Sequence, residues 1–318
     1  MEFMLYLIVG FAILIISGEV LVRGAVSLAE HFGIPSLVIG LTIVAFGTSA
    51  PELVISLKAA LTGHSGISIG NVVGSNIANI LLVLGVPALI KAIPCGGAGS
   101  ARNAVFMILV TAFFIACCWY QTFTYVHGII LLSLLVVFLA DSVVFSRKQR
   151  AMGIEVEDPL DDIGGRTNNL KVAGALLLVG LIGLPIGGHL AVNGAIGIAQ
   201  LFGVSETAIA LTVVALGTSL PELVTAIIAA RKGHTDLAMG NVIGSNVFNI
   251  LAIIGTTSVI TPIFTPERVH YFDLWVMAGT SAFLLPFVFK CIPISRRIGA
   301  LMLISYATYL YMVFHWEM

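Results

Sequence analysis

Charged residues are scarce in this sequence of 318 residues, of which only 10% are Asp, Glu, Lys or Arg. A soluble domain carries about 25% charged residues, so this chain cannot cover a folded surface with charge. It also lacks the basic patches that bind nucleic acid. In contrast, 58% of the residues are hydrophobic and the mean hydropathy is +1.07. The composition therefore predicts an integral membrane protein.

Cysteine is rare, and the motifs of common enzymes are missing. The four cysteines form no C-x-x-C pair, and two of them, Cys117 and Cys118, lie in an apolar run where cysteine behaves as a small hydrophobe. We expect neither a disulfide framework nor a thiolate metal site. H-E-x-x-H and a cysteine–histidine pair are also absent, so the sequence does not indicate an enzyme or an organic cofactor. The N-terminus has no basic region before its long apolar run, which predicts a retained transmembrane helix.

Long apolar segments are abundant, and each is long enough for a transmembrane helix of about 20 residues. Ten can be counted, at 4–29, 36–61, 66–90, 103–120, 123–145, 171–199, 206–230, 236–260, 270–289 and 297–315. The predicted fold is all-α, with a first five-helix repeat at 1–145, a polar cytoplasmic linker at 146–170 and a second five-helix repeat at 171–318.

The positions of the basic residues predict the orientation, because cytoplasmic loops hold the excess of Lys and Arg. With the N-terminus outside, the following residues fall on or near the cytoplasmic side: Arg23, Lys91, Arg102, Arg147, Lys148, Arg150, Arg166, Lys171, Arg231, Lys232, Lys290, Arg296 and Arg297. Only Lys58 and Arg268 fall on the outer side. Both termini are then expected outside, in the cytoplasmic membrane of a cell.

Two phrases occur twice in the sequence, 170 positions apart. VAFGTSAPEL at 44–53 returns as VALGTSLPEL at 214–223, and GNVVGSNIAN at 70–79 returns as GNVIGSNVFN at 240–249. Since each half contains an odd number of segments, the second half must begin on the opposite side of the membrane. Inverted repeats with interrupted helices at corresponding places indicate a secondary transporter whose site lies near the bilayer midplane.

The first phrase brings oxygen atoms to an interrupted helix. Proline has no N–H for the carbonyl four residues earlier, so Pro51 frees the carbonyl of Gly47, and the second copy repeats this. A free carbonyl in hydrocarbon costs several kcal/mol unless something satisfies it. Thr48 and Ser49 precede Glu52 by about one turn and add hydroxyl oxygens. Thr218, Ser219 and Glu222 recur in the second half after the same offset.

The second phrase adds further oxygens at i and i+4, from Ser75 with Asn79 and from Ser245 with Asn249. A cluster of oxygens without nitrogen or sulfur suits a hard cation such as Ca²⁺. Two carboxylates balance one Ca²⁺ or two Na⁺. The glycines of this phrase are predicted to permit close helix packing; they are Gly70, Gly74, Gly240 and Gly244.

Together, the duplicated GTSxPEL and GNVxGSNxxNIL phrases resemble the two alpha-repeats of the cation/calcium exchanger superfamily, in particular its bacterial and archaeal sodium/calcium exchangers. The resemblance covers essentially the whole chain and implies a ten-helix fold. It also implies a set of cation ligands: Thr48, Ser49, Glu52, Ser75, Asn79, Thr218, Ser219, Glu222, Ser245 and Asn249, with the backbone carbonyls of Ala45 and Ala215. Family members with aspartate at the position of Asn249 have a third acid, so K⁺ dependence and stoichiometry stay open.

Other polar groups in apolar segments are interpreted as structural. Glu19 aligns with His189, and the two are expected to contact each other across the pseudo-two-fold axis. Asp141 is expected to pair with Arg147 or Lys148, and the acidic stretch 155–162 is interpreted as solvated linker.

The predicted function is antiport of Ca²⁺ against Na⁺ by alternating access, with both ions and membrane lipid as the only expected partners. A Ca²⁺/H⁺ antiporter that uses the same glutamates is the main alternative, and a Ca²⁺ channel is a weaker one. Transport between the two faces is expected only when cations neutralise the paired acids.

Overall fold

A computed structural model describes residues 2–34, 36–94, 99–119, 122–151, 167, 169–202, 215–267 and 269–316. The first half is helical almost throughout. Its helices are α1 (Glu2–Phe32), α2 (Ser36–Ile39), η1 (Gly40–Val44), α3 (Ala45–Thr48), α4 (Ala50–Leu61), α5 (Ser65–Ala78), η2 (Asn79–Val83), α6 (Gly85–Ile90), α7 (Ser100–Cys118) and α8 (Tyr125–Ala151), where η denotes a π-helical turn.

The second half repeats part of this order, because its helices from α11 to α14 follow the pattern of α3 to α6. Its helices are α9 (Leu170–Leu201), α11 (Ala215–Thr218), α12 (Leu220–Arg231), α13 (Thr235–Phe248), η4 (Asn249–Ile254), α14 (Gly255–Ile260), η5 (Val269–Asp273), α15 (Leu274–Phe283), α16 (Leu285–Phe289) and α17 (Arg296–Trp316). Most of the predicted linker and the start of the predicted segment 206–230 lie outside the described residues.

Membrane-spanning helices dominate the described part of the chain. Seven helices there are long and apolar enough to cross a membrane, or up to eight if the bent pair 40–48 and 50–61, with its 49° angle, is one span. Large apolar side chains on these helices are exposed, for example Ile16 at 62%, Val136 at 65% and Leu178 at 59%. Apolar surface on this scale requires lipid around it. The protein is a multi-pass membrane protein.

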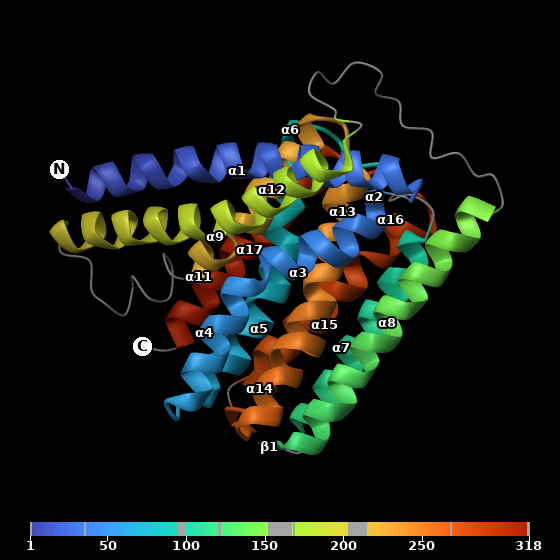
Figure 1. Ribbon diagram of the computed structural model, residues 1–318. Coiled ribbons are helices and arrows are strands. Elements are labelled where there is room, and N and C mark those ends of the chain that lie inside the picture. Colours follow the sequence, from blue (N-terminus) through green and yellow to red (C-terminus); the bar gives the residue numbers. More distant parts are fainter. Residues whose placement is uncertain are drawn as a thin grey trace.

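Helices α1 and α9 lie side by side along most of their length and cross over the remaining helices (Figure 1). Glycines allow this close approach. A Cβ atom added at Gly187 would lie 2.8 Å from the backbone nitrogen of Leu14, and one added at Gly24 would lie 2.9 Å from the carbonyl oxygen of Ala173. Small residues at such contacts let two backbones pack directly in a membrane protein.

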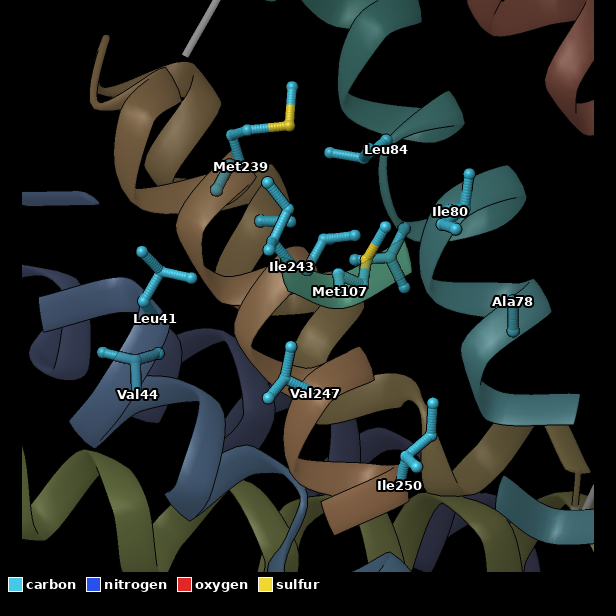
Figure 2. Close-up of a cluster of buried hydrophobic side chains, with 14 of the residues drawn as sticks. Leu41, Val44, Ala78, Ile80, Leu84, Met107, Met239, Ile243, Val247 and Ile250 are labelled. Carbon is cyan, nitrogen blue, oxygen red and sulfur yellow. The ribbon is translucent and has the colours of Figure 1, made fainter. Parts of the chain in front are cut away.

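The centre of the fold is α13 with η4 and α14, whose apolar window is 100% buried. A helix that is buried on all sides carries no polar stripe for solvent. Side chains of α13 lie between those of η1 on one side and those of η2 and the following Leu84 on the other (Figure 2). This packing joins the first half of the chain to the second around one apolar core.

Two short pairings join the ends of helices. Strand β1 (Thr122–Phe123) pairs antiparallel with β2 (Ile263–Phe264), which adds a small ribbon to a fold that the sequence predicts as all-α. Ile93, after α6, forms an isolated bridge with Ile294, before α17. Each pairing joins two segments that the sequence predicts on the same side of the membrane.

Candidate functional site

The GTSxPE phrases form helix breaks of nearly identical geometry. Ser49 separates α3 from α4 with φ −84° and ψ 3°, and Ser219 separates α11 from α12 with φ −87° and ψ 4°. Pro51 therefore lies in the first turn of α4 instead of inside a continuous helix. This is a favourable place for proline, because the first turn needs no N–H from it. Each glutamate also falls in a first turn, where the helix dipole favours a negative charge.

The second phrase ends at another irregular point in both halves. Asn79 is the first residue of η2, and Asn249 is the first residue of η4. π-helical turns are rare and are frequent at functional sites. Helix α4 packs against η4, and α12 packs against η2. The acidic helix of each half thus lies beside the π turn of the other half.

Glu52 and Glu222 are the two acids at this junction, and they are 1% and 0% exposed. Their carboxylates lie close enough for their charges to repel each other. The Oε2 atom of each is buried without a hydrogen-bond partner among the described residues. A buried carboxylate is costly unless it is paired or coordinates a metal, so these two acids could hold a cation.

The hydroxyl groups of the predicted ligands surround these acids. Ser49 donates a hydrogen bond from Oγ to Oε1 of Glu222 across 3.3 Å, which links the two halves. Thr48 Oγ1 lies 3.4 Å from the carbonyl oxygen of Ala45 and 3.3 Å from Oδ1 of Asn241. The predicted ligands Thr218, Ser219, Ser75 and Ser245 are all buried. The Oγ atoms of Ser219 and Ser245 have no partner in the described structure.

The asparagines of the GNVxGSNxxN phrases form a bridge between the halves. Asn79 donates from Nδ2 to Oδ1 of Asn246 across 3.0 Å, and Asn249 donates from Nδ2 to Oδ1 of Asn76 across 3.0 Å. The side-chain oxygens of Asn79 and Asn249 are left buried and unpartnered within the described residues. Asn76 and Asn246 were absent from the predicted ligand set. The signal for them was their own repetition, three positions before the predicted ligands on the same helix face.

Asn71 and Asn241 are another pair 170 positions apart that the sequence analysis did not single out. Asn71 donates from Nδ2 to the carbonyl of Glu52 at 3.2 Å and to Oγ of Ser56 at 2.9 Å. The position that corresponds to Ser56 is Ala226. The support of the two glutamates is therefore not the same in the two halves.

The expected role of the glycine pairs holds for Gly244. A Cβ atom added there would lie 2.8 Å from Cα of Leu41, so α13 approaches η1 directly. For Gly70 and Gly74 the expectation stays a prediction, because no heavy atom of the described residues lies within 4 Å of a Cβ added at either position. The residue that corresponds to Leu41 is 211, which falls in the undescribed stretch 203–214.

Two of the expected structural contacts involve other partners. Glu19 forms ion pairs with Arg23, at 2.9 Å, and with Lys232, instead of the expected contact with His189. His189 lies 3.0 Å from the Nδ2 atom of Asn193. Lys232 belongs to the loop after α12, so this network ties α1 to the second half.

Asp141 was expected to pair with its sequence neighbours Arg147 or Lys148. The structure instead gives it an ion pair with Arg102 of α7 at 3.2 Å. Arg102 also stacks over the ring of Phe145, with its guanidinium carbon 4.0 Å from the ring centre. The contact joins α7 to α8 away from the paired glutamates. The acidic linker stretch 155–162 lies outside the described residues.

Oxygen is the common chemistry of the central site. Six of the predicted ligand atoms are buried oxygens without a partner in the described residues: Glu52 Oε2, Asn79 Oδ1, Ser219 Oγ, Glu222 Oε2, Ser245 Oγ and Asn249 Oδ1. The described part of the chain contains no cluster of three or more His, Cys, Asp or Glu side chains suited to a transition metal. Carboxylate, amide and hydroxyl oxygens together suit Ca²⁺ or another hard cation.

Comparison with known proteins agrees with this chemistry. The family model described as sodium/calcium exchanger protein matches residues 2–144 and 172–315. The chain is 38% identical to the putative antiporter CaxA of Alkalimonas amylolytica over 98% of both chains. It is 31% identical to the sodium/calcium exchanger MaX1 of Methanosarcina acetivorans, again over 98% of both chains.

Solved structures give the same result. The fold is similar to that of the sodium-calcium exchanger NCX_Mj, with a TM-score of 0.83, 31% identity and 98% coverage of both chains. A family match over most of the chain and full-length relatives above 30% identity identify the protein as a transporter. The chain belongs to the sodium/calcium exchanger protein family.

Proposed function

We propose that this protein exchanges Ca²⁺ for Na⁺ across the cytoplasmic membrane, by alternating access to one site between its two halves. The observation that carries the proposal is the set of buried, unpartnered oxygens around Glu52 and Glu222. Leaving a buried polar atom without a partner costs about 1–3 kcal/mol, and more for a charged group. One bound cation would satisfy several of these atoms at once.

The ligands of the transported ions would come from both halves. We assign this role to the twelve predicted residues: Ala45, Thr48, Ser49, Glu52, Ser75, Asn79, Ala215, Thr218, Ser219, Glu222, Ser245 and Asn249. The two carboxylates match the charge of one Ca²⁺ or two Na⁺, so the ions would compete for the same oxygens. The relatives named as a sodium/calcium exchanger support this choice of ions.

The coupling of the two ions follows from the acids. Without a cation, the paired carboxylates would face each other in a low-dielectric interior, and moving them between the two membrane faces would be costly. Bound cations remove this repulsion. The protein would therefore change its open side only when loaded, which makes it an exchanger and not a uniporter.

The arrangement in the membrane would be two inverted five-helix repeats, 1–145 and 171–318, with ten spans and both termini outside. The two segments that match the family model, 2–144 and 172–315, support these boundaries. The contacts between asparagines 170 positions apart support a pseudo-two-fold axis between α5 and α13. The site would lie on this axis, near the bilayer midplane.

The test is ⁴⁵Ca²⁺ uptake into proteoliposomes with the membrane potential clamped. We expect an outward Na⁺ gradient to drive uptake, while a pH gradient of equal size in symmetric Na⁺ drives little. Uptake driven only by the pH gradient would show that protons, and not Na⁺, are the coupling ions. Flux without any counter-gradient at rates far above carrier turnover would identify a channel and would refute exchange.

A further inference from the structure

Four asparagines, two from each half, form one hydrogen-bonded group at the pseudo-two-fold axis. Asn76 and Asn79 come from α5 and the start of η2, and Asn246 and Asn249 come from α13 and the start of η4. All four are at most 1% exposed. Asn79 and Asn249 are proposed ligands, whereas Asn76 and Asn246 have no role in the proposed exchange so far.

Asn76 and Asn246 are anchored by each other's main chain. Asn76 donates from Nδ2 to the carbonyl oxygen of Asn246 across 3.3 Å, and Asn246 donates from Nδ2 to the carbonyl oxygen of Asn76 across 3.2 Å. A main-chain carbonyl only accepts hydrogen bonds, so the atom that faces it must be the amide nitrogen. The orientation of both side-chain amides is therefore determined by the backbone of the opposite helix.

This orientation passes to the second pair of asparagines. With its nitrogen on the carbonyl, Asn76 turns Oδ1 toward Asn249, and only the amide nitrogen of Asn249 can donate to that oxygen, at 3.0 Å. Asn246 acts on Asn79 in the same way, also at 3.0 Å. As a result, Oδ1 of Asn79 and Oδ1 of Asn249 point away from these bonds and have no partner among the described residues.

We propose that Asn76 and Asn246 are positioning residues, each of which holds the amide of the opposite half's ligand with its oxygen toward the cation. The inference rests on the proposed cation site and adds a determinant of its specificity. An asparagine amide that is free to turn presents its NH₂ group to the site about as readily as its oxygen. An NH₂ group repels a cation, so the anchored pair keeps the site in the form that binds Ca²⁺.

The connection is crossed, and this makes it testable. Asn76 lies in the same helix run as Asn79 but holds Asn249, and Asn246 lies beside Asn249 in sequence but holds Asn79. Loss of Asn76 should therefore matter only while Asn249 has an amide to orient. Simple packing of Asn76 in the core would instead affect both ligands alike.

The experiment is a double-mutant cycle on the Ca²⁺ dissociation constant, measured by isothermal titration of the full-length protein in detergent. Loss of a hydrogen-bonding ligand to a charged group is expected to weaken binding about ten-fold or more for Asn249→Ala and for Asn79→Ala. We expect Asn76→Ala to weaken binding about three- to ten-fold alone, to add nothing to Asn249→Ala, and to add its full effect to Asn79→Ala.

The outcomes separate the inference from the function on which it rests. Equal coupling of Asn76 to both ligands, or additivity with both, overturns the positioning role. Unchanged Ca²⁺ binding in both Asn79→Ala and Asn249→Ala overturns the cation site itself. Ser142→Ala is the control, because Ser142 is a buried serine of α8 that bonds to its own helix at the carbonyl of Phe138.

A second cycle protects the test from a variant that fails to fold. Asn246→Ala is expected to add nothing to Asn79→Ala and its full effect to Asn249→Ala, which is the mirror image of the first pattern. Asn76→Ser, which keeps a small polar side chain, replaces Asn76→Ala where needed. The inference stands only if the crossed pattern is found in each cycle that can be measured.

Discussion

Replacement of Glu222 by glutamine should weaken Ca²⁺ binding without lowering the stability of the ion-free protein. Oε1 of Glu222 accepts a hydrogen bond from Ser49 across 3.3 Å, and a glutamine oxygen can keep this bond. The new amide nitrogen takes the place of Oε2, which has no partner in the described residues. The substitution also removes the repulsion between the two carboxylates. In a Ca²⁺ chelator, Glu222→Gln should therefore unfold at the same temperature as the parent protein or at a higher one.

The affinity of Glu222→Gln for Ca²⁺ should fall, although its stability in the chelator does not. Removing one partner of a buried ion pair costs about 3–5 kcal/mol, which corresponds to about 150- to 4,000-fold in the Ca²⁺ dissociation constant. At a Ca²⁺ concentration 100-fold above the parent's dissociation constant, the parent protein gains about 2.7 kcal/mol of stability. At that concentration a 150-fold weaker variant gains only about 0.3 kcal/mol.

Thermal unfolding in detergent, with and without Ca²⁺, measures both effects in one assay. The matched control is Asp141→Asn, which removes an acid that pairs with Arg102 outside the site. The control should keep the full stabilisation by Ca²⁺. If Glu222→Gln keeps it too, or if the variant is much less stable in the chelator, then Glu222 does not hold the cation and the reasoning is refuted.

Three further variants test other contacts. Asn249→Asp should weaken Ca²⁺-dependent exchange despite its added charge, because a carboxylate oxygen would replace the N–H that donates to an acceptor at 3.0 Å; tighter Ca²⁺ binding by titration would contradict this. Lys232→Met removes an ion-pair partner of Glu19 and should lower the free energy of unfolding by about 1 kcal/mol without changing the Ca²⁺ dissociation constant. Gly187→Val should cost about 1–3 kcal/mol in thermal unfolding by overpacking α1 against α9, whereas Gly174→Ala, where an added Cβ meets nothing within 4 Å, should not; equal effects would show that the helix contact is not tight.

The helix breaks were predictable because their cause is local. Proline lacks an N–H wherever it stands, so Pro51 and Pro221 predict interruptions beside Glu52 and Glu222 without knowledge of any neighbour. The pairing of the two acids was also within reach, since an inverted repeat brings equivalent positions together where they lie close to its axis. Both features are read from one stretch of sequence and its copy.

The π turns at Asn79 and Asn249 were not predictable in the same way. The sequence there continues as ordinary apolar helix, whereas in the structure each turn packs against the acidic helix of the other half. The predictions of ion-pair partners were wrong for a related reason. Asp141 had two basic neighbours in the sequence, but its partner Arg102 lies 39 positions away on an adjacent helix.

The hydrogen bonds between the asparagines were predictable only in part. Repetition marks Asn76 and Asn246 as strongly as it marks Asn79 and Asn249, but composition does not tell which amide faces an ion and which faces another amide. Only the carbonyl contacts between the opposite helices decide this.

The most direct measurement is a crystal structure of the protein in Sr²⁺, with the ion located by its anomalous scattering as a stand-in for Ca²⁺. We expect one strong peak between the two halves, with carboxylate oxygens of both Glu52 and Glu222 at about the 2.3–2.6 Å that Ca²⁺ adopts, or slightly longer. A peak that touches only one of the two acids, or a fully occupied ion elsewhere with none between them, would contradict the paired-carboxylate site.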